Sequence, residues 1–148
     1  MKKLCTLLIL GIMSITTMAK NQYDVTYHTQ RVGSVDVFYR SAGNPAKPAI
    51  LLLHGFPSAS HQFRELIPEL MNDFYVVAPD YPGFGQSSMP NREEFAYTFD
   101  HLAHVIDDFT DSIGLNKFAM YVFDYGAPIG FRIALWHPER ITAIVSQN

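Results

Sequence analysis

The sequence of 148 residues has a single cysteine, Cys5, which lies in an apolar segment at the N-terminus. The rest of the chain therefore has no thiol for a disulfide or for cysteine chemistry. It also lacks a block of Lys or Arg: 11 basic and 14 acidic residues give a formal net charge of −3. This mildly acidic balance gives no sign of nucleic-acid binding.

The N-terminal segment predicts export. Lys2 and Lys3 precede a largely apolar stretch, residues 4–18, and Ala19 closes a small-residue cleavage site. A stretch this short, below the roughly 20 apolar residues that span a membrane, favours a secretory signal peptide; an uncleaved anchor is the alternative. We expect residues 1–19 to be removed, leaving residues 20–148 in the periplasm or secreted, without a membrane span.

Beyond residue 20, apolar runs of strand length alternate with helical patterns. Strands are expected over residues 25–29, 35–39, 49–53, 74–78, 118–123 and 141–145, and helices over residues 61–71, 98–113 and 126–136. Pro68 is expected to kink or shorten the first helix. Thr98 is placed to cap the second, and Gly114 to end it. This order predicts an α/β fold: a mostly parallel sheet with helices on both faces and an N-terminal antiparallel hairpin.

Three loops at carboxyl ends of expected strands carry polar or glycine-rich motifs. They are HGFP at residues 54–57, DYPGFGQS at residues 80–87 and DYG at residues 124–126. HGFP alone fits a turn with a structural His54. The DYPGFGQS loop lacks both the full G-x-G-x-x-G pattern and a P-loop lysine, which argues against a nucleotide cofactor. Asp124 fits either a helix N-cap or a nucleophile exposed in a strand–turn–helix elbow.

Together, in this order and spacing, the three loops resemble the α/β-hydrolase family. Within it they resemble the epoxide hydrolases and haloalkane dehalogenases, whose elbow carries Asp, and the resemblance covers roughly residues 23–148. It implies an α/β-hydrolase fold and no cofactor. It also implies that Asp124 is the nucleophile and that the backbone N–H groups of Phe56 and Tyr125 form the oxyanion hole.

The chemistry of a carboxylate suits that role. Its reference pKa is about 3.9, so it is ionised at neutral pH and can attack carbon without a base. Haloalkane dehalogenases commonly carry Asn and Trp at the positions of Phe56 and Tyr125, and neither is present. The resemblance therefore favours epoxide-hydrolase-like activity through an alkyl-enzyme ester, on an apolar epoxide or related electrophile. Dehalogenase-like or other hydrolase activity is the alternative.

The catalytic acid and histidine of the family have no counterpart after Asp124. His137 is the one later histidine, and a helix of about ten residues would carry it roughly 15 Å from the elbow. We therefore expect the N-terminal half of a hydrolase domain, truncated after about the sixth strand, without the cap and C-terminal part. A non-catalytic remnant or interaction module is the alternative. Its last strand would expose an unpaired edge, and the apolar face of the helix at residues 98–113 would be incompletely covered.

Two further possibilities are disfavoured by the residues present. His101 and His104 lie three residues apart among acidic residues, a pattern more typical of a solvated helix face than of a metal site. A flavodoxin-like binding domain would need a phosphate loop after the first parallel strand, and HGFP is not one. We expect neither a metal nor a cofactor.

The export hypothesis predicts a shortened product. Cell fractionation with intact-mass measurement should find a chain lacking residues 1–19 outside the cytoplasm, because signal peptidase removes the segment during translocation. Full-length protein retained in the cytosol would contradict it.

Overall fold

The computed structural model describes residues 24–148. The predicted signal peptide, residues 1–19, lies outside the described residues. The elements in chain order are β1 (Thr26–Val32), β2 (Val35–Ala42), β3 (Ala49–Leu53), η1 (Ser60–Phe63), α1 (Leu66–Leu70), β4 (Tyr75–Pro79), α2 (Phe99–Ser112), β5 (Phe118–Phe123), α3 (Gly126–Trp136), η2 (Pro138–Arg140) and β6 (Ile141–Gln147).

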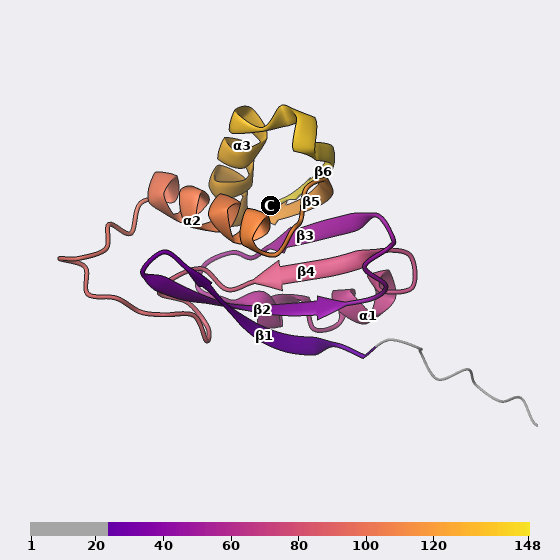
Figure 1. Ribbon diagram of the computed structural model, residues 1–148, viewed down its shortest axis with the longest axis horizontal. Helices are drawn as coiled ribbons and strands as arrows, with labels where there is room; N and C mark the ends of the chain where they lie inside the picture. The colour runs from indigo at the N-terminus through magenta and orange to yellow at the C-terminus, as the bar shows by residue number, and fades with distance from the viewer. Residues whose placement is uncertain (1–23) are drawn as a thin grey trace, which may run out of the picture.

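The six strands form one sheet in the order β1-β2-β4-β3-β5-β6 (Figure 1). β1 and β2 pair as an antiparallel hairpin, and β2 runs antiparallel to β4. The pairs β3–β4, β3–β5 and β5–β6 are parallel. The predicted fold class, a mostly parallel sheet with an antiparallel hairpin at its edge, is confirmed.

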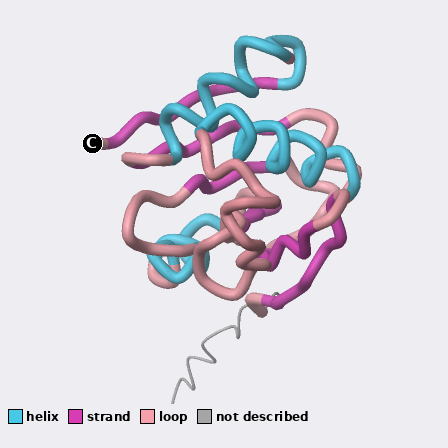
Figure 2. Tube along the Cα trace, turned by 90° about the vertical axis from the view of Figure 1, so that its left-hand side faces the viewer, coloured by secondary structure: helices cyan, strands magenta, loops and turns pink. Residues whose placement is uncertain are grey.

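Helices cover both faces of this sheet, with α2 and α3 on one side and α1 on the other (Figure 2). Side chains alternate along β3: Leu51 and Leu53 face the core beneath α2 and α3, and Leu52 faces the core beneath α1. All three are fully buried. This two-sided burial explains why the sequence of β3 is a continuous apolar run.

The helix predicted over residues 61–71 is shortened, as expected from Pro68, but it is not one continuous element. The chain instead forms the short 3-10 helix η1 and the five-residue helix α1. Pro68 lies in the first turn of α1, where its missing N–H removes no intrahelical hydrogen bond. The proline is therefore compatible with the helix start, and the two pieces together still cover their face of the sheet.

Helix α2 begins where its cap was predicted. The Oγ1 atom of Thr98 accepts a hydrogen bond from the N–H of His101 at 3.2 Å, and Gly114 follows the helix with a φ of 73°. On its apolar face Leu102, Ile106 and Phe109 are buried and Ile113 is half-buried, and Phe109 packs edge-on against Tyr39 with ring centroids 5.0 Å apart. The expected lack of cover is therefore wrong for all but Ile113, because the β1–β2 hairpin and α3 both pack against this face.

Strand β6 forms an open edge of the sheet, as expected. Every residue of this strand after Ile141 is exposed, including Ile144 and Val145. Leu135 on α3 adds a further apolar side chain that is 80% exposed. No helix within residues 24–148 is long and apolar enough to cross a membrane.

Arg140 ties the end of the chain to α2. Its guanidinium donates to the Asp107 carboxylate at 2.9 Å, to Thr110 Oγ1 at 2.8 Å and to the Leu115 carbonyl at 2.8 Å. It also lies over the ring of Phe118, 5.4 Å from the centroid. The Arg140 and Asp107 side chains are each 11% exposed, so the pair is largely shielded from water.

Removing the Arg140 charge should therefore destabilise the fold. We expect Arg140→Met to lower the free energy of unfolding in urea by about 3 kcal/mol, because the largely buried Asp107 would lose its arginine partner, and Thr110 and the Leu115 carbonyl would lose a donor. The control is Arg31→Met, which breaks an ion pair with Asp36 whose two side chains are 60% and 48% exposed. That variant should lose less than about 1 kcal/mol. Equal losses in the two variants would contradict the role given to Arg140.

Candidate active site

The three motif loops meet at one edge of the sheet. They leave the carboxyl ends of β4, β3 and β5, which are neighbours in the sheet and parallel to one another. In open α/β sheets this edge is where ligands bind. Asp124 lies here, in the turn between β5 and α3.

Asp124 has an unusual backbone conformation. Its φ of 49° lies in the left-handed region, and no other non-glycine residue among those described has a positive φ. This conformation costs an L-residue about 1–2 kcal/mol. The turn is held by the N–H of Ala127, which donates to the Asp124 carbonyl at 2.9 Å as α3 begins.

The Asp124 carboxylate points to the HGFP loop rather than to the helix. Its Oδ1 atom accepts a hydrogen bond from the backbone N–H of Phe56 at 2.8 Å. No other hydrogen bond to this carboxylate comes from residues 24–148, so Asp124 does not cap α3 through its side chain. The geometry therefore matches an exposed elbow better than a helix cap.

Two glycines allow the loops to come this close. A Cβ atom on Gly55 would lie 2.7 Å from the Cβ of Asp124, and a Cβ on Gly126 would lie 2.3 Å from the backbone oxygen of Leu53. Both distances are far inside van der Waals contact. The absence of side chains at these two positions therefore sets how closely the elbow approaches β3 and the HGFP loop.

Tyr125 follows Asp124, and aromatic contacts fix its ring. The ring centroids of Phe99, Phe56 and Phe84 lie 4.8, 5.3 and 6.4 Å from that of Tyr125. The backbone N–H of Tyr125 has no hydrogen-bond partner in the described part of the chain. The structure thus brings together the three predicted site residues, with one of the two expected backbone donors already on Asp124.

His54 is a buried, neutral structural residue of the HGFP loop. Its Nε2 accepts from the N–H of Tyr81 at 3.4 Å, so its proton lies on Nδ1, 3.0 Å from the Gly55 carbonyl. Burial lowers the pKa of His54, an effect that the Gly55 carbonyl and the charge of Asp80 partly oppose. This arrangement agrees with the structural role that the HGFP turn alone suggested for His54.

Tyr81 packs against His54 in the same interior. Its hydroxyl donates to the His54 carbonyl at 3.0 Å, and the two rings stack with centroids 4.1 Å apart. Burial raises the pKa of Tyr81 well above its usual value, and the negative charge of Asp124 adds to the effect. Tyr81 therefore links the DYPGFGQS loop to the HGFP loop as an uncharged hydrogen-bond donor.

Asp80 organises the DYPGFGQS loop rather than facing a ligand. Its two carboxylate oxygens accept hydrogen bonds from the N–H groups of Ser60 at 2.7 Å and Gln86 at 2.8 Å. Its carbonyl accepts from the Ser87 hydroxyl at 2.7 Å. Because Asp80 is buried and both oxygens are engaged, it is a poor candidate for a nucleophile.

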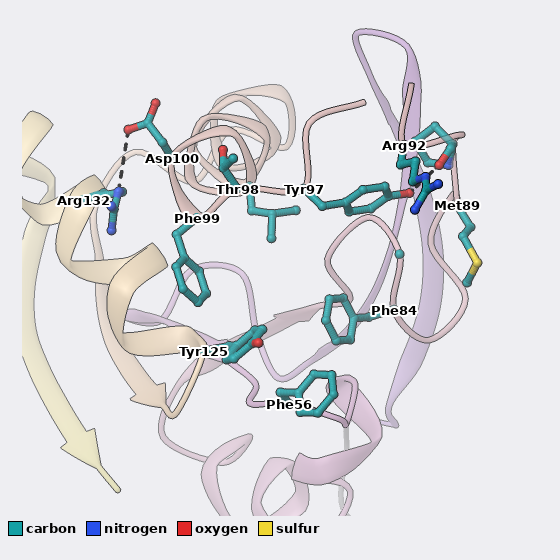
Figure 3. Close-up of a pocket in the computed structure, with 13 residues that line it drawn as sticks. Phe56, Phe84, Met89, Arg92, Tyr97, Thr98, Phe99, Asp100, Tyr125 and Arg132 are labelled. Atoms are coloured by element: carbon teal, nitrogen blue, oxygen red, sulfur yellow. Dashed lines mark hydrogen bonds and ion pairs between the residues drawn. The ribbon is translucent and has the colours of Figure 1, made fainter. Parts of the chain in front are cut away.

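A cavity of about 880 Å³ opens between the HGFP loop, the DYPGFGQS loop and the start of α2, and Tyr125, the residue after Asp124, lines it. Figure 3 shows the rings of Phe56, Phe84, Phe99 and Tyr125 gathered at one end of it, with Met89 and Arg92 at the other. Asp100 and Arg132 form an ion pair of 3.6 Å on its wall. Sequence reasoning missed Phe84 and Phe99 as lining residues. Phe84 lies within a motif and could have been found, whereas Phe99 carries no signal beyond that of a residue in the first turn of α2.

The remaining histidines lie elsewhere. His137 follows α3, and its Nε2 lies 2.9 Å from an Asp107 oxygen. His101 is 3.0 Å from the Ala96 carbonyl, whereas His104 stacks on Trp136, so the two do not share a ligand position. Within residues 24–148, no three metal-ligating side chains form a group that could hold an ion.

The strained backbone of Asp124 predicts an unusual mutational pattern. Asp124→Gly should have a free energy of unfolding about 1 kcal/mol higher than that of Asp124→Ala, because glycine adopts a positive φ without steric cost. Both variants lose the Phe56 hydrogen bond, so the difference isolates the backbone. Urea unfolding of the two proteins measures it.

Asp108 supplies the matched control, since it is exposed in the interior of α2. There the order should reverse, with Asp108→Gly about 1 kcal/mol less stable than Asp108→Ala. The same order at both positions would show that Asp124 is not held in the left-handed region.

Comparison with known proteins agrees with this site. A sequence model described as alpha/beta hydrolase fold matches residues 48–148. A protein of Saccharomyces cerevisiae named as an uncharacterized hydrolase is 53% identical over 114 residues, covering 77% of this chain and 39% of that protein. Haloalkane dehalogenase 2 of Mycobacterium tuberculosis is 40% identical over 101 residues, covering 68% of this chain and 35% of its own. Epoxide hydrolase 4 of Mus musculus is 37% identical over 110 residues, covering 74% of this chain and 30% of that protein.

Solved structures show the same likeness. A loop variant of a haloalkane dehalogenase from Bradyrhizobium elkanii superposes with a TM-score of 0.79 at 28% identity, covering 83% of this chain and 40% of that one. An epoxide hydrolase mutant of Vigna radiata superposes with a TM-score of 0.76 at 28% identity, covering 83% of this chain and 38% of that one. The chain thus spans about two fifths or less of the length of these relatives. With the family's sequence pattern, sheet order and elbow all present, this chain belongs to the α/β-hydrolase fold family.

Proposed function

We propose that this chain carries the nucleophile of an epoxide-hydrolase-like enzyme, with Asp124 forming an alkyl-enzyme ester. One observation carries the proposal. The Phe56 N–H holds the Oδ1 atom of Asp124 at 2.8 Å, while its Oδ2 atom accepts no hydrogen bond from residues 24–148. One oxygen is thus anchored and the other is available to attack carbon.

The anchored oxygen has a second use after attack. When Oδ2 bonds to an epoxide carbon, that carbon–oxygen bond of the epoxide breaks and its electron pair stays on the ring oxygen. Oδ1 becomes the carbonyl oxygen of the ester, already beside the Phe56 N–H. The unpartnered N–H of Tyr125 is available as the second donor when water attacks that carbonyl. Such a donor can be worth about 2.7–4 kcal/mol in the transition state.

The described residues support the first half of the reaction more than the second. Hydrolysis of the ester needs a base to activate water, the role that histidine commonly takes. No histidine among residues 24–148 hydrogen-bonds with Asp124, and His54 is buried with both ring nitrogens engaged. We therefore assign formation of the ester, rather than complete turnover, to this part of the chain.

The cavity favours an apolar small-molecule electrophile. Four aromatic rings line the cavity next to the elbow, those of Phe56, Phe84, Phe99 and Tyr125, and Phe56 is 58% exposed. Burying apolar substrate surface against such rings contributes roughly 25 cal/mol per Å². An epoxide with an alkyl or aryl substituent fits this lining, in keeping with the relatives named as epoxide hydrolases.

Dehalogenation is the second candidate. The relatives named as haloalkane dehalogenases favour it, and the same carboxylate could displace a halide from carbon. The phenylalanine side chain at position 56, however, has no hydrogen-bond donor for a departing halide. We therefore propose epoxide opening first and dehalogenation second.

Ester trapping tests the proposal. Folded protein is incubated with a small terminal epoxide, and the adduct is mapped by peptide mass spectrometry. We expect a site-selective ester on Asp124, because its Oδ1 atom is anchored on the Phe56 N–H while its Oδ2 atom is free to attack carbon. Asp124→Asn should form none.

Two carboxylates in the same protein serve as internal controls. Asp80 has both oxygens hydrogen-bonded, and Asp36 lies on the exposed hairpin with its side chain 48% accessible. Neither should be modified at the rate of Asp124. Modification spread evenly over the carboxylates, or no modification of Asp124 in a protein shown to be folded, would refute the assignment.

A further inference from the structure

We propose that the cavity binds an amphiphilic anion, with the apolar body of the ligand on the aromatic rings and its carboxylate on Arg92. As a statement about substrate this rests on the proposed function, because it narrows the epoxide to one that carries a carboxylate at the far end of its chain. Arg92 is assigned a role in binding and specificity, apart from the residues that react.

The two ends of the cavity differ in chemistry. Four aromatic rings line one end. That end is next to the elbow, because the N–H of Phe56 donates to Asp124 and Tyr125 follows Asp124. Figure 3 shows Arg92 and Met89 at the other end, and Met89 is 75% exposed. A ligand that lies along the cavity would therefore contact rings at one end and a cation at the other.

The charge of Arg92 is not neutralised within the described part of the chain. The other arginine of the lining, Arg132, pairs with Asp100 at 3.6 Å, whereas the Arg92 side chain receives no ion pair or hydrogen bond from residues 24–148. The lining thus carries two arginines and one aspartate, in a chain whose formal net charge is −3. This local excess of positive charge favours an anionic ligand.

The turn that carries Arg92 is held by hydrogen bonds to Asn91. The carbonyl oxygen of Asn91 accepts from the N–H groups of Glu94 and Phe95, each at 2.9 Å. Its Oδ1 atom accepts from the N–H of Glu93 at 3.1 Å. Phe95 is 4% exposed, which anchors the turn in the core. The backbone of Arg92 is therefore fixed, while its long side chain is exposed and can reach a ligand.

Tyr97 joins this turn to the wall of the cavity. Its hydroxyl donates to the Pro90 carbonyl at 2.6 Å, and its ring centroid lies 4.8 Å from that of Phe95. A Cβ atom on Gly83 would lie 2.7 Å from the Tyr97 ring, so the ring packs directly on the DYPGFGQS loop. These contacts hold the segment that bears Arg92 beside the cavity before a ligand arrives.

A carboxylate is the head group that suits an arginine best. A planar guanidinium can donate two parallel hydrogen bonds to its two oxygens. A neutral amide can accept a hydrogen bond from the same group but offers it no charge. Because Arg92 is exposed, the gain from the charge is that of a surface ion pair. We therefore expect a preference for the acid over the amide, of about threefold to fivefold in affinity.

Isothermal titration calorimetry with octanoate and octanamide tests the site without a reactive group. The two ligands have the same chain, and octanoate alone is charged. The full 148-residue chain should bind octanoate about threefold to fivefold more tightly than octanamide. Arg92→Gln should bind the two equally, with its affinity for octanamide changed by less than about twofold. High salt should weaken the preference of the parent protein.

Two further variants are the controls. Arg92→Lys keeps the charge and should keep a preference for octanoate. Arg64→Gln removes the same charge outside the cavity, where Arg64 pairs with Glu65 at 3.4 Å, and should keep the full preference. Circular dichroism and urea unfolding establish that each variant is folded. Equal loss of the preference in Arg92→Gln and Arg64→Gln would reveal an effect of net charge alone and overturn the inference.

Reactive ligands test the substrate separately. The parent protein and Arg92→Gln are treated with an octanoate that carries a terminal epoxide and with the corresponding epoxy amide, and ester on Asp124 is quantified by mass spectrometry. Below saturation, the parent protein should be modified about threefold to fivefold faster by the acid than by the amide. Arg92→Gln should remove this difference.

The outcomes separate this inference from the proposed function. A folded parent protein that binds no octanoate, or binds octanoate and octanamide equally, would overturn the anion site whether or not Asp124 reacts. A preference for octanoate that survives Arg92→Gln would do the same. A preference that Arg92→Gln removes, with no ester on Asp124 from either epoxide, would support the anion site and overturn the proposed function.

Discussion

The hydrogen bond from the Phe56 N–H to the Asp124 carboxylate joins two loops that lie 68 residues apart in the sequence. The rest of the site depends on it. Gly55 and Gly126 let the backbones approach, and the left-handed conformation of Asp124 directs its carboxylate away from α3 and toward the HGFP loop. The buried side chain of Tyr81 stacks on His54 and donates to its carbonyl, and so holds the HGFP loop in place. Residues that their surroundings hold in a strained backbone conformation are common at active sites.

Much of the fold could be predicted because its signals are local. The continuous apolar run of β3 and the Thr98 cap of α2 each identify their element without knowledge of the neighbours. The prediction was wrong where the environment of an element depends on distant parts of the chain. The apolar face of α2 is covered by the β1–β2 hairpin, which lies far earlier in the chain. The register of a sheet and the cover over a helix are long-range properties, which periodicity alone does not contain.

The candidate site was likewise predicted only in part from the sequence. Asp124 was a candidate because it lies in a strand–turn–helix elbow, and the resemblance to the α/β-hydrolase family implied the roles of Phe56 and Tyr125. The three residues do lie together. The sequence did not indicate that one oxygen of Asp124 would already be anchored, nor that Phe99 would pack on Tyr125. Those contacts depend on how α2 and α3 lie across the sheet.

The central claim is that Asp124 uses one oxygen for attack while the other stays on the Phe56 N–H. A crystal structure of the trapped ester tests it most directly, because it locates both oxygens of the former carboxylate. We predict the new bond to carbon on Oδ2, with Oδ1 still accepting from the Phe56 N–H near the 2.8 Å of the free protein. An ester bonded through the oxygen that faces Phe56, or an Asp124 turned away from that N–H with a φ outside the left-handed region, would contradict the account.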